Sequence, residues 1–198
     1  MDEPWEELRS RIEPNLEKSR QYLAEKGVSA QDILLAVHPF DTAWPALPDE
    51  SLDHLVRICT IAKVFGEMGG RIFELQSEYN SSFGDYLMHV SLDTRMNRTF
   101  MTDPYGSRPH IGFDGLAKEL QEALLPNGKV YLFGSRLNDA GRDIPWGCVG
   151  AAWESLSKRG VPAFILRDYC FQAGAGMHVW RVDDITALKP DKQYQGCI

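Results

Sequence analysis

The chain has 198 residues, of which 43% are hydrophobic and 25% are charged, a balance that excludes intrinsic disorder. Its net charge of −7 does not favour a nucleic-acid partner, because neutralising phosphates requires an excess of lysine and arginine. No apolar run is long enough to span a bilayer, so we expect no membrane partner.

The N-terminal residues and the cysteines indicate a cytoplasmic protein. Residues 1–11 are acidic and polar, unlike a signal or transit peptide. The cysteines form no CxxC pair, and a chain of this size can bury a sufficient core without disulfides. We therefore expect reduced thiols at all four positions, which are Cys59, Cys148, Cys170 and Cys197.

The first segment of the chain predicts a helical region. Residues 5–26 carry a thin apolar stripe at helical spacing, Pro14 kinks or divides the helix, and Gly27 ends it. We expect this segment, residues 1–27, to pack on a single α/β domain that comprises the whole chain.

The next residues alternate between strand and helix patterns. Residues 33–37 are continuously apolar, which is typical of a strand buried on both faces. An amphipathic helix is predicted from Asp49 to the glycines at 69–70. Residues 71–76 and 86–92 predict two strands, which we expect to pair as a hairpin around a turn within residues 80–84.

The second half of the chain repeats this alternation. It predicts helices over residues 113–125 and 147–158, and strands over 129–133, 161–166 and 177–182. Together these elements predict an α/β fold in which a mixed sheet is covered by helices. Ligands of such sheets usually bind in the loops that follow the carboxyl ends of the strands.

Residues 128–145 contain a strand followed by Gly134-Ser135. This stretch resembles the small nucleotidyltransferases of the polymerase-β type, in which a Gly-Ser turn holds a nucleotide phosphate. The resemblance implies that Asp143 is the first metal-binding aspartate and that Asp168 stands for the third carboxylate. The second aspartate of the family's pair is absent, so the resemblance implies nucleotide binding more directly than metal catalysis.

A broader hypothesis does not depend on that family. A polar, glycine-containing loop between strand and helix, here Gly134–Cys148, is a general cradle for small anions. We expect Ser135 and nearby amides to hold the anion, Arg136 to neutralise it, and Arg142 and Asp143 to face the ligand. A small soluble enzyme, such as a transferase, or a binding domain for an anionic or nucleotide-like molecule would fit this pattern.

A second hypothesis is based on a thiol. Cys148 lies near the start of a predicted helix, where partial positive charge favours the thiolate. His178 follows on a later strand, and Asp183 or Asp184 comes after it, a layout that resembles papain-like thiol hydrolases. These residues predict a cysteine-dependent hydrolase, deamidase or transferase, with Arg142 stabilising an anion. The plainer alternative is that Cys148 is a small buried hydrophobe.

A third alternative is a non-catalytic module whose acidic surface binds a basic protein partner. The sequence identifies no cofactor. Five scattered polar residues were considered as metal ligands, but they show no HxH or HExxH spacing, so no metal site is predicted: His38, Asp41, His89, Asp93 and His110.

Overall fold

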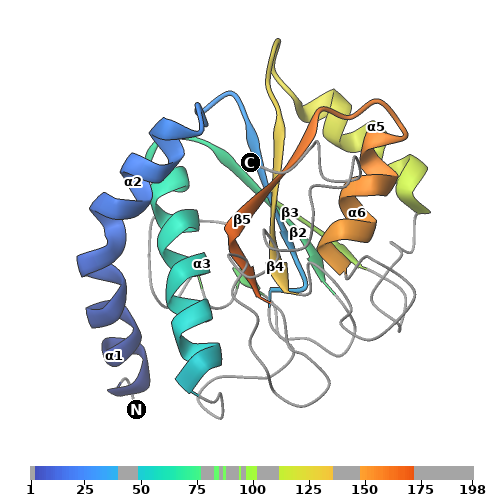
Figure 1. The fold of residues 1–198 in the computed structure, drawn as a ribbon. Helices are drawn as coiled ribbons and strands as arrows, with labels where there is room; N and C mark the ends of the chain where they lie inside the picture. Colours follow the sequence, from blue (N-terminus) through green and yellow to red (C-terminus); the bar gives the residue numbers. More distant parts are fainter. Residues whose placement is uncertain are drawn as a thin grey trace, which may run out of the picture.

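The computed structural model describes residues 3–39, 49–76, 83–84, 87, 94, 97–101, 112–135 and 148–171. Five strands in these ranges form one sheet with the order β3-β2-β1-β4-β5 (Figure 1). All four pairings between them are parallel. The strands are β1 (Ile33–Val37), β2 (Arg71–Gln76), β3 (Arg98–Met101), β4 (Val130–Ser135) and β5 (Ala163–Phe171).

Helices cover both faces of the sheet, so the predicted α/β fold is confirmed. One face carries α1 (Glu3–Ile12), the 3-10 turn η1 (Glu13–Asn15), α2 (Leu16–Glu25) and α3 (Asp49–Glu67). The other face carries α5 (Gly112–Ala123) and α6 (Cys148–Ser157) (Figure 1). None of the described helices is both long enough and apolar enough to cross a membrane.

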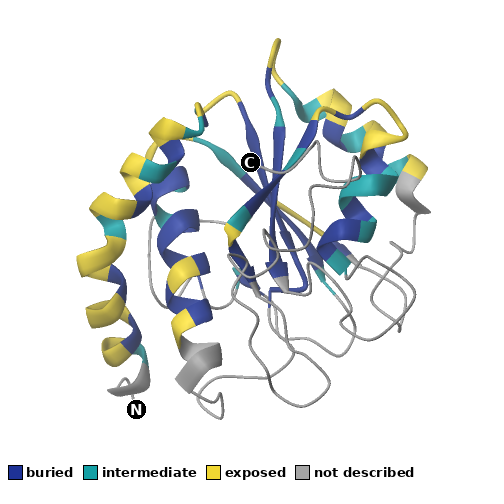
Figure 2. Cartoon of the chain, viewed as in Figure 1, coloured by how far each residue is buried: buried dark blue, intermediate teal, exposed yellow. Residues whose placement is uncertain are grey.

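β1 is the central strand, and its sequence explains that position. All five of its residues are buried, because both of its edges are paired and both of its faces are covered (Figure 2). Leu34 and Ala36 belong to the apolar core beneath α1, α2 and α3. Ile33, Leu35 and Val37 belong to the second core, beneath α5 and α6. The continuous apolar run therefore supplies both cores in alternation.

The N-terminal helical segment packs along α3. Pro14 lies in the η1 turn between α1 and α2, as the sequence predicted, because a proline inside a continuous helix would remove a hydrogen bond. The apolar stripe of the segment is buried in the core on this face, with Leu8, Ile12 and Leu23 at most 2% exposed. Burial of this stripe attaches the segment to the sheet through α3.

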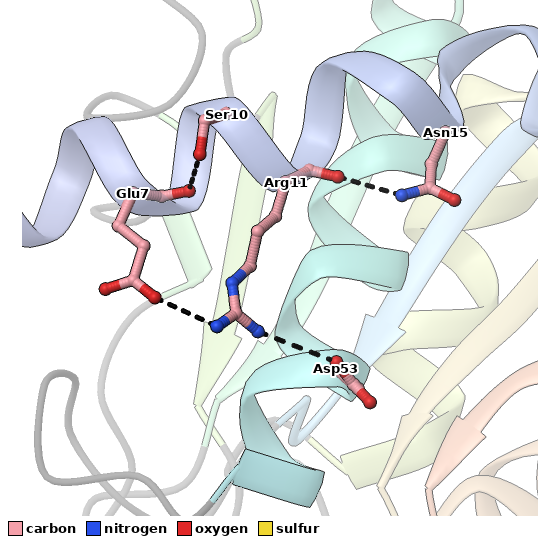
Figure 3. A network of polar contacts seen from close by, with 5 residues as sticks. All are labelled: Glu7, Ser10, Arg11, Asn15 and Asp53. Atoms are coloured by element: carbon pink, nitrogen blue, oxygen red, sulfur yellow. Dashed lines mark hydrogen bonds and ion pairs between the residues drawn. The ribbon is translucent and has the colours of Figure 1, made fainter.

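A polar network lies on the outer side of this contact (Figure 3). The Arg11 guanidinium contacts the Glu7 carboxylate at 2.9 Å and the Asp53 carboxylate of α3 at 3.9 Å. Ser10 Oγ donates to the Glu7 carbonyl oxygen, and Asn15 Nδ2 donates to the Arg11 carbonyl oxygen. These side chains are exposed, so each ion pair contributes less than about 1 kcal/mol. The apolar stripe, not this network, holds the segment in place.

The predicted hairpin is wrong. Residues 71–76 form β2 as expected, but both edges of β2 are occupied by parallel partners, β1 and β3. Leu87, inside the predicted second strand, is helical and buried. On the side away from β1, β2 pairs with β3, a strand that the sequence did not predict. The predicted strand over 177–182 lies outside the described residues.

Candidate functional site

The strand order of the described sheet changes its winding direction between β1 and β4. From β1 the chain crosses to β2 through α3 on one face, and from β4 it crosses to β5 through α6 on the other. β1 and β4 are neighbours, so the two crossovers diverge between their carboxyl ends. Such a topological switch point is the usual ligand site of doubly wound parallel sheets. We call it the switch point below.

Gly134 lies at the switch point, within β4. We expected Gly134 and Ser135 to form a turn after the strand, and this is wrong because β4 continues through Ser135. Gly134 pairs with Val37 of β1 on one side and with Cys170 of β5 on the other. Its φ is +139°, and an added Cβ would overlap the Val37 carbonyl oxygen. Only glycine allows β1 and β4 to approach this closely.

His38 is the first residue after β1, on the opposite side of the switch point from Ser135. It is buried, with 3% of its surface exposed, and its φ is +40°. Its backbone N–H donates to the Leu75 carbonyl oxygen of β2 at 3.0 Å. A positive φ is uncommon for any residue other than glycine, and Pro39 restricts the preceding residue further. The exit of β1 is therefore a strained segment held by hydrogen bonds.

His54 of α3 fixes the next residue. Its Nε2–H donates to the Pro39 carbonyl oxygen at 3.0 Å, which requires that nitrogen to carry a proton. The ring is buried, and burial lowers the pKa of His54 to about 3, with the nearby Arg57 charge adding to the effect. His54 is therefore neutral at pH 7 and acts as a hydrogen-bond donor from α3 to the exit of β1.

Glu74 is a fully buried carboxylate on β2, beside the central strand. It accepts a hydrogen bond from the backbone N–H of Phe83 at 2.7 Å and a longer one from Thr99 Oγ1 at 3.4 Å. The Phe83 ring in turn packs edge-on against Phe133 of β4, with 5.7 Å between centroids. Glu74 thus ties Phe83 to the sheet beside Phe133, which is a structural role.

Cys148 is the first residue of α6, as the predicted helix start implied. α6 follows β4, so Cys148 lies at the carboxyl edge of the sheet. Its side chain is half-buried and packs partly against the core on that face. Cys59 and Cys170 are buried instead, and burial raises the pKa of the Cys59 thiol. Of the three cysteines in the described residues, Cys148 is the most accessible.

The remaining predicted site residues divide into two groups. Asp168 is exposed and lies inside β5, because the strand predicted over 161–166 continues to Phe171. The other four lie outside the described residues, in the segments that follow β4 and β5: Arg136, Arg142, Asp143 and His178. Within the described ranges, no three His, Cys, Asp or Glu side chains are grouped so that they could hold a metal ion.

The sequence reasoning missed His54 and gave His38 no role beyond the rejected metal group. The sequence did carry one signal for His38, because His38 and Pro39 directly follow the continuously apolar residues 33–37. Ligand-binding residues gather at such strand ends. The positive φ of His38 has no sequence signature. No protein-family model, curated protein or solved structure matches the chain significantly.

Proposed function

We propose that this chain binds an anionic or nucleotide-like small molecule at the switch point between β1 and β4. The observation that carries the proposal is the parallel order β3-β2-β1-β4-β5, which brings the carboxyl ends of β1 and β4 together where the two crossovers diverge. α3, α5 and α6 all begin on this side of the sheet, so their positive helix ends favour an anion there.

The loop after β4 supports the proposal better than the loop after β1. Residues 38–48 contain three prolines and no glycine, so they do not resemble a dinucleotide-binding glycine loop. The segment 134–147 contains three glycines together with Ser135, Arg136 and Arg142. Glycines allow backbone N–H groups to approach a phosphate, and the arginines match its charge. We assign phosphate binding to this loop.

Thermal shift measurements test this assignment. Inorganic phosphate, pyrophosphate, AMP and ADP are added separately to the wild type. At about ten times the Kd, a ligand stabilises the fold by about 1.4 kcal/mol, which raises Tm by about 3–5 °C. The double variant S135A/R136A should abolish the shift. The matched control is S107A/R108A, which removes the same Ser-Arg pair from the other Gly-Ser-Arg sequence and should keep the shift.

Two results would reject the proposal. One is that none of the four compounds raises the Tm of the wild type. The other is that S107A/R108A abolishes the shift as completely as S135A/R136A, because the effect would then not depend on the β4 loop.

A second function is favoured by one observation, the position of Cys148. We propose that this thiol is the nucleophile of a hydrolase or transferase that acts at the same edge of the sheet. A half-buried cysteine at the first position of α6 combines access with the positive end of the helix, whereas Cys59 and Cys170 are buried.

Alkylation by iodoacetamide, followed by mass spectrometry, tests the thiol proposal. Cys148 should react at least about tenfold faster than Cys59, with a rate that reaches half its maximum well below pH 8.5, the ordinary thiol value. Cys170 is the internal control, because it is buried at the same edge of the sheet. Equal, slow labelling of all three cysteines would contradict a nucleophilic role.

A further inference from the structure

We draw no further inference here: the strongest candidate, the side-chain cluster of Ser19, Tyr22 and Tyr169 where α2 packs on β5, is explained by the attachment of that helix to the sheet, and nothing in the described residues points to a ligand there.

Discussion

The two edges of the sheet are built differently. At the amino edge, the helices lead into strands through short turns, and each turn contains a residue suited to a positive φ: Gly27, Gly69, Asn127 or Gly160. At the carboxyl edge, the two described residues with a positive φ are Gly134 and His38, on neighbouring strands. The amino edge thus uses conformationally tolerant residues, whereas the carboxyl edge combines a required glycine with a strained histidine.

The two edges also differ in the buried side chain that supplies their hydrogen bonds, an acceptor at the amino edge and a donor at the carboxyl edge. At the amino edge, the buried Asp32 carboxylate accepts from the backbone N–H groups of Ser29 and Lys129 at 2.7 and 2.8 Å. This one side chain joins the turns that precede the two central strands. At the carboxyl edge, the buried donor His54 holds a strained strand exit. The amino edge is thus joined by a well-satisfied carboxylate, whereas the carboxyl edge holds an uncommon backbone conformation.

The largest effect is expected at Gly134. In G134A the new Cβ overlaps the Val37 carbonyl oxygen, so β1 and β4 must separate at the centre of the sheet. We expect a loss of about 4 kcal/mol or more in the free energy of unfolding, measured by urea denaturation. The control is G160A, where φ is also positive but no atom lies within 4 Å, so only about 1 kcal/mol should be lost. Equal losses would remove the argument for a close approach at the switch point.

The next effect tests the amino edge. D32A leaves two half-buried N–H groups without their carboxylate partner, and we expect it to cost about 2–4 kcal/mol in urea denaturation. D53A is the matched control. The Asp53 side chain is 75% exposed and forms a long ion pair with Arg11, so its loss should cost less than about 0.5 kcal/mol. A D32A loss as small as that of D53A would contradict the stabilising role of this edge.

The smallest effect is the pH dependence contributed by His54. The folded state lowers its pKa to about 3 from an ordinary 6.5, so below pH 6.5 the unfolded chain binds the proton and the folded chain does not. The contribution of His54 to the free energy of unfolding is therefore full above about pH 6.5. It is lost as the pH falls toward 3, by up to about 1.4 kcal/mol per pH unit. H54Q should be less sensitive between pH 7 and 5, measured by urea midpoints, and identical slopes would argue that His54 is not held neutral.

Among the strands, the sequence predicted those whose residues are mostly buried. β1 and β2 have the predicted bounds, because a continuous apolar run between turn residues fits a strand buried on both faces. β3 was missed because it has only four residues at the edge of the described sheet, and its first two residues, Arg98 and Thr99, are exposed. The sequence of residues 71–76 carries no signal that the strand pairs in parallel, since the direction of pairing depends on the connections between the strands.

The site was less predictable than the fold. Cys148 was placed at a helix start, and the loop after β4 was selected, because both have local sequence signals. The extension of β4 through Ser135 was not predicted, because it depends on pairing with β1 and β5. The positions of His38 and His54 depend on a backbone angle and a hydrogen bond between two elements, and neither follows from residue type or spacing.

The outer strand β5 has a property that bears on solubility. Ile165 of β5 pairs with Leu132 of β4, and Cys170 of β5 pairs with Gly134 of β4. Four residues of β5 therefore lie between these two pairs, opposite a single residue of β4. The ladder is therefore irregular over residues 166–169 of β5, among which Asp168 is exposed. An irregular, charged border is a poor template for another chain, because it offers no straight row of amide and carbonyl groups. Within the described sheet, this strand is therefore a poor template for stacking with further copies.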